Sequence, residues 1–375
     1  MIPTARPAFS DAELSRVAEV FDSRWLGQGA VTAEFEQAVS ERVGGRPFLA
    51  TSTGTAAMHL ALEAIGIGPG DDVVLPSLTF VATTQAVVAA GARPVLCDVD
   101  SATLNVDVDC LERAVTNRTR AIIPVHYRGL PLDLDEILAW AGVRGIRVVE
   151  DAAHAFGSVY RDGTPVGGKG DITCFSFDPI KNVTTGEGGG IVFSAEEERA
   201  RAARMAVLGI DTTAWGRLET RRPWAYDVTQ DGFRYHMPNF CAAIGLAQLE
   251  RFEERRRCKQ SVLARYQDAF RDLPYLEQRE MPVERCFPFL ALVLVDDRDS
   301  FMSQMKERGV GTGVHYIPSH RFSRFRDCAA GKLGVTDDVA DRICSLPLLG
   351  DQTDAELEQV VEAVLSFAPR SSEVS

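Results

Sequence analysis

The feature that most constrains the fold is an alternation of short β-rich runs and helix-like segments between residues 53 and 193. Apolar residues recur at helical spacing through 55–65, and further helix-like segments are 79–90, 108–116 and 133–141. Short β-rich runs lie between or after them, at 72–75, 93–97, 121–125, 146–149, 171–177 and 190–193. This order predicts a mostly parallel sheet with helices on both faces, in which ligands bind at the carboxyl ends of the strands.

The second half of the chain leads into a second, smaller unit. We expect a helix over 195–207, a long irregular segment rich in aromatic residues and arginine over 208–238, and one long bridging helix over 240–269. A strand at 292–295 and helices at 300–308 and 353–366 follow. The expected organisation is a large domain over residues 1–250, with an N-terminal arm, and a small α+β domain over 251–375.

Charge and cysteine usage narrow the partners and the compartment. With 40 Lys+Arg against 53 Asp+Glu, the formal net charge is −13, which argues against nucleic acid because phosphate backbones need clustered basic residues. No apolar stretch is long enough to cross a bilayer, and the N-terminus lacks the apolar core of a signal peptide. The 8 cysteines are scattered without a CxxC pair, so we expect reduced thiols in a cytoplasmic protein and no metal site.

Lysine is scarce, which makes each lysine informative. Lys169, Lys181, Lys259, Lys306 and Lys332 are the only lysines among the 40 basic residues. Lys181 follows an apolar run and a proline, and it precedes a loop with four glycines in the five residues 186–190. An amine can form a Schiff base, and glycines let the backbone approach a ligand closely. Lys181 is therefore the strongest catalytic candidate; the alternative is a surface lysine on a flexible hairpin.

Two further motifs accompany this lysine. Asp151 ends a short apolar run, where ligands bind in a parallel sheet, and small residues follow it. Gly54 and Thr55 open an expected helix, whose free N–H groups and dipole favour a phosphate. Each has an ordinary structural alternative, because Asp151 can cap the next helix and residues 51–55 can form a common N-cap. The glycines at 66, 68 and 70 follow a helix, so they are not a dinucleotide fingerprint.

An amine, a carboxylate and a phosphate site at one sheet edge are the set that pyridoxal 5′-phosphate (PLP) needs. The lysine forms a Schiff base, and the carboxylate keeps the pyridine nitrogen protonated. An aromatic ring against the cofactor face completes such a site. Phe80 is the candidate, and a core phenylalanine is the equal alternative.

These residues resemble a known family over nearly the full length. The matching segments are 52–62, 76–82, 150–157, 176–189, 242–249 and 314–320, and the chain resembles the DegT/DnrJ/StrS family of PLP-dependent sugar aminotransferases. The resemblance implies the type I, aspartate aminotransferase-like fold. It also implies that Lys181 carries the cofactor and Asp151 pairs with the ring nitrogen. The remaining cofactor contacts that it implies are the phosphate held by Gly54, Thr55 and Ser176, Phe80 on the ring, and His154 beside the phenolic oxygen.

The chain departs from the family pattern at residue 234. The family has an asparagine there, which reaches the cofactor phosphate of the neighbouring subunit, whereas this chain has Arg234. A charged contact with the phosphate is one interpretation, and pairing with Asp227 or Asp231 is the other. The resemblance also implies a substrate site that includes Trp215, Arg217, His315, Tyr316 and His320. The run 124–127 weakly resembles enzymes that aminate the sugar 4-position.

From these motifs and the resemblance we expect a homodimeric PLP-dependent aminotransferase with shared active sites. It is expected to move an amino group from glutamate to a nucleotide-linked keto-deoxysugar, with a dTDP-4-keto-6-deoxyhexose as the expected acceptor. A 3-keto sugar nucleotide and a keto-inositol are the nearest alternatives. A PLP-binding regulatory protein without turnover and a nicotinamide oxidoreductase are rivals of other classes, and the second lacks its glycine fingerprint.

Overall fold

A computed structural model describes residues 1–212, 214–217, 222, 224–279 and 281–369 of the chain. Its centre is a seven-stranded sheet with the strand order β1-β7-β6-β5-β4-β2-β3. The five strands from β3 to β6 are parallel neighbours, while β7 is antiparallel to both β6 and β1. The expected mostly parallel sheet is confirmed; the strands are β1 Phe48–Thr51, β2 Asp72–Pro76, β3 Arg93–Cys97, β4 Thr119–Ile122, β5 Arg147–Asp151, β6 Ile172–Ser176 and β7 Gly189–Phe193.

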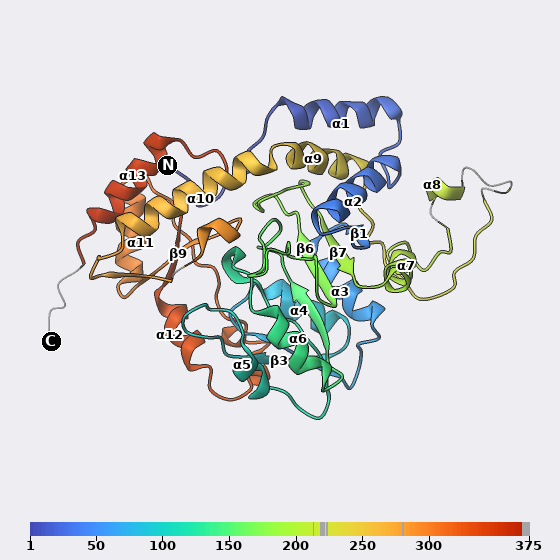
Figure 1. The fold of residues 1–375 in the computed structure, drawn as a ribbon, viewed down its shortest axis with the longest axis horizontal. Coiled ribbons are helices and arrows are strands. Elements are labelled where there is room, and N and C mark those ends of the chain that lie inside the picture. The colour runs from blue at the N-terminus through green and yellow to red at the C-terminus, as the bar shows by residue number, and fades with distance from the viewer. Residues whose placement is uncertain (213, 218–221, 223, 280, 370–375) are drawn as a thin grey trace.

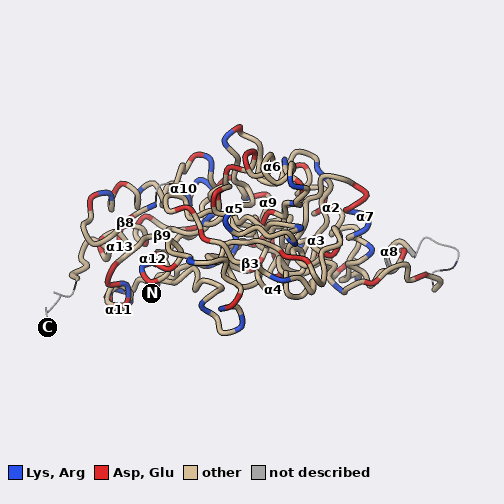
Figure 2. The backbone as a smooth tube through the Cα atoms, turned by 90° about the horizontal axis from the view of Figure 1, so that it is seen from below, with Lys and Arg blue, Asp and Glu red and all other residues tan. Residues whose placement is uncertain are grey.

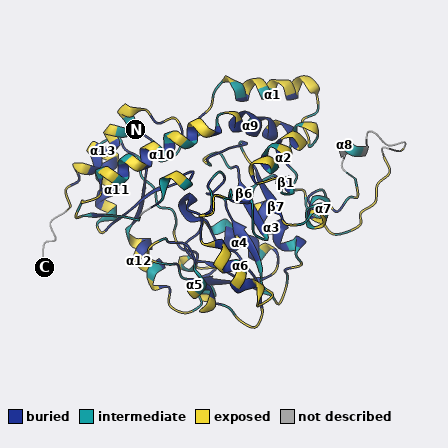
Figure 3. Ribbon diagram, viewed as in Figure 1, coloured by how far each residue is buried: buried dark blue, intermediate teal, exposed yellow. Residues whose placement is uncertain are grey.

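Helices cover both faces of this sheet, because successive strand residues point to opposite sides. In β5, Val148 packs into the apolar layer beneath one set of helices and Val149 into the layer beneath the other. The first set is α2 (Ala30–Arg42), α5 (Val108–Glu112), α6 (Leu134–Gly142) and α9 (Asn239–Glu250). The second set is α3 (Gly54–Ala64), α4 (Val81–Ala89) and α7 (Glu196–Met205). Figure 3 shows the strands of the sheet buried between these layers.

A second, three-stranded antiparallel sheet lies at the other end of the molecule (Figure 1). Its strands are β8 (Leu276–Gln278), β9 (Ala291–Val295) and β10 (Ile343–Leu346), and its apolar core includes residues of α10 (Phe252–Ala269), α11 (Arg298–Glu307) and α13 (Asp354–Leu365). The N-terminus reaches this part, because Ile2 forms a bridge with Val310. The separate sheets support the expected division at residue 250, which stays a prediction.

One expectation about helices needs correction. The single helix expected over 240–269 is interrupted at Arg251, whose φ of −101° and ψ of 19° leave the helical region between α9 and α10. The N-terminal arm is largely helical, with α1 (Asp11–Ser23) and α2 packed on α9. A capping box starts α1, because Ser10 and Glu13 satisfy each other's backbone N–H groups.

The remaining helices are short. They are α8 (Ala214–Arg217), which lies on an arm away from the sheets in Figure 1, and α12 (Gly334–Arg342). Acidic and basic residues are interspersed along the backbone in the view of Figure 2. Among the described residues, no helix combines the length and the apolar character that a bilayer span requires.

Candidate active site

A cavity of about 270 Å³ lies at the carboxyl ends of β5 and β6. Segments far apart in the sequence form its walls: the start of α3, the loop before α4, the loops after β5 and β6, and residues 315–316. Nine of the residues predicted for the site line this cavity, namely Gly54, Thr55, Phe80, Asp151, His154, Ser176, Lys181, His315 and Tyr316. Parallel strands bring these side chains together because their carboxyl ends meet at one edge.

The N-terminus of α3 forms one wall of the cavity. Thr53 is the N-cap, and its hydroxyl accepts the N–H of Ala56 at 3.0 Å. The first N–H groups, at Gly54 and Thr55, have no intrahelical acceptor, and the helix dipole favours an anion there. A Cβ at Gly54 would lie 2.8 Å from Cβ of Ser176, so glycine lets this helix end approach the Ser176 hydroxyl.

Asp151 presents a buried carboxylate to the cavity. It is the last residue of β5 and is 4% exposed. Its Oδ2 accepts a hydrogen bond from the Thr83 hydroxyl at 2.7 Å, and its Oδ1 accepts the N–H of Ala153 at 3.1 Å. No lysine or arginine of the described chain forms an ion pair with it. The two hydrogen bonds orient the carboxylate, which remains available to a cationic group of a ligand.

Lys181 enters the cavity from the loop after β6. A turn fixes its backbone, with the Lys181 N–H donating to the carbonyl of Asp178 at 3.0 Å. Its Nζ lies 4.4 Å from the centroid of the Phe289 ring. Burial lowers the pKa of Lys181 to about 8, although Asp178 and Asp151 act in the opposite direction. A much larger fraction of this amine is therefore neutral near pH 7 than for an exposed lysine, which is what a nucleophile needs.

Four aromatic rings lie in contact with one another beside Lys181, those of Phe80, Tyr316, His154 and Phe289. His154 stacks on Phe289 with a centroid distance of 4.2 Å, and its Nε2 lies 3.0 Å from the Tyr316 hydroxyl. Burial and the charge of Lys181 hold the pKa of His154 well below its usual range, so the ring is neutral. Phe80 is half exposed at the cavity edge, 5.4 Å from the ring of Tyr316.

The residues present fit the expected cofactor. Helix α3 and Ser176 offer donors to a phosphate, Asp151 offers a carboxylate to a ring nitrogen, and Lys181 offers an amine. His154 Nδ1 is buried and has no hydrogen-bond partner within the described chain, so it is available to a ligand atom. The donor set thus covers both the charged end and the ring of PLP.

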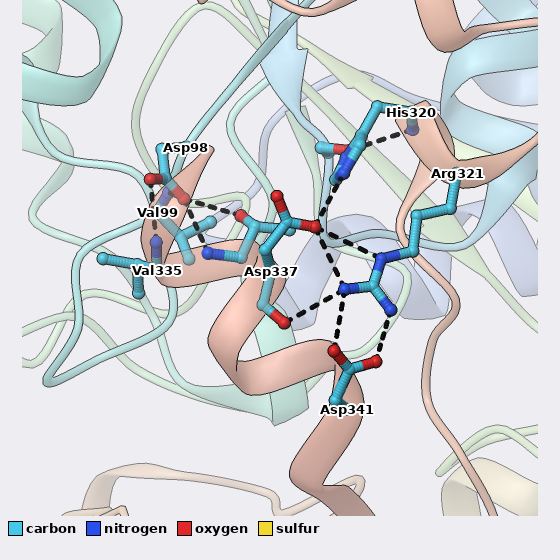
Figure 4. A network of polar contacts seen from close by, with 9 residues as sticks. Asp98, Val99, His320, Arg321, Val335, Asp337 and Asp341 are labelled. Carbon is cyan, nitrogen blue, oxygen red and sulfur yellow. Dashed lines mark hydrogen bonds and ion pairs between the residues drawn. The ribbon is translucent and has the colours of Figure 1, made fainter. Parts of the chain in front are cut away.

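His320 lies outside the cavity, in contrast to the expectation. Its Nδ1 is 2.7 Å from the Ser77 hydroxyl and its Nε2 is 3.0 Å from Asp337, as Figure 4 shows for the neighbouring network. Arg321 also binds Asp337 and reaches Asp341. His320 therefore ties the segment that carries His315 and Tyr316 to the large sheet, because Ser77 directly follows β2.

Two other predicted residues, Trp215 and Arg234, also lie apart from the cavity. Trp215 packs edge-on against Trp25 with a centroid distance of 5.1 Å, on the arm that bears α8. The side chain of Arg217 lies outside the described residues. Arg234 is exposed and its side chain has no hydrogen bond or ion pair within the described chain, so the alternative pairing with Asp227 or Asp231 is not present. Within one subunit, neither Trp215 nor Arg234 lines the cavity.

The run 124–127 contributes differently from its expected role. Val125 lines the cavity, but His126 is fully buried and its Nε2 lies 2.8 Å from Glu150 Oε2. Glu150 precedes Asp151 and therefore points to the opposite face of β5. Tyr127 is also buried and donates its hydroxyl to the carbonyl of His315. Only Val125 of these three is in a position to contact a ligand.

Sequence reasoning missed two contributors to the site. Thr83, which orients Asp151, lies one helical turn after Phe80 but carries no motif of its own. Phe289, which packs against Lys181 and His154, comes from the segment before β9. The apolar sequence around it is typical of any buried core residue. Both act through contacts across more than 60 residues of sequence, so no local signal marks them.

Comparison with known proteins agrees with this geometry. The model of the DegT/DnrJ/EryC1/StrS aminotransferase family matches residues 7–365. AtS13 from Actinomadura melliaura is 37% identical with a TM-score of 0.91, over 98% of this chain and 99% of AtS13. The sugar aminotransferase CalS13 from Micromonospora echinospora is 33% identical with a TM-score of 0.90, over 98% of this chain and all of CalS13 (100%).

A third similar structure carries the expected cofactor. Spr1654 from Streptococcus pneumoniae, solved in its PLP form, is 26% identical with a TM-score of 0.87, over 97% of each chain. Together with the family match across nearly the whole chain, the cavity and its donor set identify the class of protein. The chain belongs to the DegT/DnrJ/EryC1/StrS aminotransferase family and is a sugar aminotransferase that uses PLP.

Proposed function

We propose that this enzyme transfers the amino group of L-glutamate to the keto group of a nucleotide-linked deoxysugar, a dTDP-4-keto-6-deoxyhexose. The observation that carries the proposal is the buried amine of Lys181, which shares one cavity with the Asp151 carboxylate and the N-terminus of α3. A similar structure, CalS13, is a sugar aminotransferase, which supports a sugar as the acceptor.

Each group of the cavity has a role in this proposal. PLP, when bound, supplies a reactive carbonyl and a ring that takes up electrons. Gly54, Thr55 and Ser176 hold its phosphate, and Asp151 holds a proton on the ring nitrogen. Lys181 would attach the cofactor and, as a free amine, would be the acid/base group that moves a proton between the cofactor carbon and the donor carbon, and in the second half-reaction between the cofactor carbon and the sugar carbon.

The ring-contacting residues position the cofactor in this proposal. Phe80 packs against the ring from the cavity edge. His154 lies beside the phenolic oxygen and stays neutral, because its site is buried and faces Lys181. A neutral imidazole can accept a hydrogen bond without adding positive charge to the ring.

Substrate contacts are proposed for two regions. His315 and Tyr316 line the cavity and are placed to meet the sugar ring. Trp215 and Arg217 lie on the arm of α8, where they are proposed to meet the nucleotide diphosphate bound to another subunit. Glutamate is the proposed donor because the resemblance to the family implies it.

A homodimer with shared sites is part of the proposal. Large apolar side chains are exposed on the N-terminal arm and on the arm of α8, including Phe9 (54%), Leu14 (72%), Phe21 (60%) and Trp224 (76%). Contiguous apolar patches mark interaction surfaces, and we propose that these side chains belong to one. Arg234, unpaired in one subunit, is proposed to bind the cofactor phosphate of the other.

The test is a screen of keto-sugar nucleotides with glutamate as the donor. We expect amination of a dTDP-4-keto-6-deoxyhexose, with NMR of the product placing nitrogen at carbon 4. Nitrogen at carbon 3, or turnover of a keto-inositol instead, favours the corresponding alternative. Bound PLP without reaction of any sugar nucleotide contradicts the proposal.

A further inference from the structure

A second lysine lies beside the proposed reactive one. Lys259 in α10 is 7% exposed, and its Nζ is 5.9 Å from the centroid of the Phe289 ring, against 4.4 Å for Lys181 Nζ. The two lysines also line a separate small cavity of about 10 Å³, which has room for about one water molecule. Nothing in the proposed reaction uses Lys259.

Lys259 is held by an amide rather than by a carboxylate. Its Nζ donates to Oδ1 of Asn182 at 2.8 Å, and Nδ2 of Asn182 donates to the carbonyl of Phe287 at 2.9 Å. No carboxylate of the described chain forms an ion pair with it. Because Asn182 directly follows Lys181, this contact couples the position of Lys259 to the loop that carries the reactive amine.

Both basic and acidic groups surround the two lysines. Arg255 is 3% exposed and lies on the same helix as Lys259, with its guanidinium bonded to Gln248. Arg6 lines the small cavity and is paired with Asp351 and Glu356. The titratable groups that face Lys259 also include Cys258 and Asp351, and those that face Lys181 are Asp151, Asp178, His154 and His315.

These charges bring the two amines into the same titration range. Burial and the charge of Arg255 lower the pKa of Lys259 to about 7. Burial lowers the pKa of Lys181 to about 8. Two ammonium groups in one nearly dry space repel each other, so neighbouring amines of this kind titrate as a pair.

We propose that Lys181 and Lys259 form a coupled amine pair that shares one proton, with Lys259 as the proton acceptor for Lys181 through the small cavity that both residues line. The step is a proton exchange: the ammonium of Lys181 loses a proton to the neutral amine of Lys259, and no other bond changes. Because Lys259 has the lower pKa of the two, its amine is neutral while Lys181 is still charged, and it can take up the Lys181 proton when that amine reacts. Lys259 is thus a positioning residue. The inference rests on the proposed role of Lys181.

The test measures both amines in the cofactor-free protein. Trace acetylation with acetic anhydride over pH 5–10, followed by peptide mass spectrometry, gives the titration midpoint of each lysine. Each of the five lysines has a different neighbouring sequence, so its peptide can be identified by mass. The exposed Lys306 and Lys332 serve as internal standards. Lys259→Arg replaces the partner by a permanent charge, whereas Lys259→Met removes the charge at similar length.

In Lys259→Arg we expect the midpoint of Lys181 to fall by about one pH unit or more, because the neighbouring charge no longer titrates. In Lys259→Met we expect it to stay at or above the wild-type value. Lys306→Arg, a matched exchange on the surface, should leave it unchanged. Equal midpoints of Lys181 in wild type, Lys259→Arg and Lys259→Met would overturn the proposal.

If Lys259→Arg does not fold, the wild-type curves decide. If the two amines are coupled, the titration curves of Lys181 and Lys259 are shallower than the curve of a single independent group. Two curves that each fit one independent proton contradict the proposal. Reduction with borohydride, which reports cofactor attachment at Lys181, is a separate measurement. Failure of the pairing is therefore distinguishable from failure of the proposed function.

Discussion

Surroundings, more than residue type, decide what a lysine of this chain does. Lys169 is partly buried, which lowers the pKa, but its ion pairs with Asp135 and Asp162 raise the pKa overall. Lys181 lies in a deeper site without an ion pair among the described residues, and burial lowers its pKa to about 8. The same amine is therefore a charged surface group in one place and a nucleophile in the other.

The first prediction at this scale concerns cofactor attachment. We expect the purified protein to be yellow and borohydride to fix the cofactor on Lys181, because this amine lines the cavity with Asp151 and α3. Peptide mapping checks the result, and the other four lysines act as controls. An adduct on another lysine contradicts the assignment.

The second prediction concerns Asp151→Asn. The amide keeps the size of the side chain and can still contact Thr83, but it cannot hold a proton on the ring nitrogen. We expect PLP to remain partly bound and the half-reaction with glutamate to slow by about 10²- to 10³-fold, the usual effect of removing one electrostatic contact in an active site. Stopped-flow absorbance measures the rate. Near wild-type rates would show that Asp151 is only structural.

At the scale of elements, the site depends on how closely three backbone segments approach. A Cβ at Gly189, the first residue of β7, would lie 2.5 Å from the backbone of Thr53 and Gly54 at the start of α3. A side chain there would push the helix end away from Ser176. Glycine at this position is therefore required by packing around the proposed phosphate site.

The prediction for this element is that Gly189→Ala weakens PLP binding and lowers the free energy of unfolding by about 1–3 kcal/mol, as overpacking commonly does. Titration with PLP and urea denaturation measure the two effects. Gly334→Ala is the matched control, because a Cβ at this position in α12 would meet no atom within 4 Å. Unchanged PLP affinity in Gly189→Ala would show that the helix end has no part in binding.

A brace of polar contacts also acts between elements. Asp98, which follows β3, accepts the N–H groups of Val335 and Thr336 at the start of α12, and Asp337 of the same helix binds His320 and Arg321 (Figure 4). The brace connects the segment bearing His315 and Tyr316 to the large sheet. It explains why a histidine predicted for substrate binding has a supporting role.

At the scale of the whole molecule, one subunit leaves the proposed site incomplete. Arg234 is exposed and unpaired among the described residues, and it does not line the cavity of its own chain. An arginine offers a phosphate a charged, forked donor. Each site of the proposed dimer then takes Lys181 from one chain and Arg234 from the other.

Mixing two inactive chains tests this arrangement. Arg234→Ala should weaken PLP binding about 10- to 100-fold, the effect of losing one charge-assisted hydrogen bond. At a PLP concentration that leaves Arg234→Ala inactive, mixing it with Lys181→Ala should restore roughly a quarter of wild-type activity, because half of the dimers are mixed and each has one intact site. No recovery after confirmed subunit exchange would show that Arg234 serves only its own chain.

Local patterns were sufficient for the architecture and for the centre of the site. The alternation of strands and helices predicted the parallel sheet, because burial on both faces imposes apolar runs that are visible in the sequence. The scarcity of lysine and the glycine loop singled out Lys181. The motifs around Asp151 and Gly54 predicted cavity-lining residues because strand ends and helix starts have local signatures.

Only the tertiary structure decided what each side chain faces. It turned His320 toward Ser77 and Asp337, buried His126 against Glu150, and broke the long helix at Arg251. It also brought Phe289 and Lys259 to Lys181 from more than 70 residues away. Such contacts depend on how whole elements pack, and a sequence pattern of period 2 or 3.6 reports which face is buried but not which residue lies opposite.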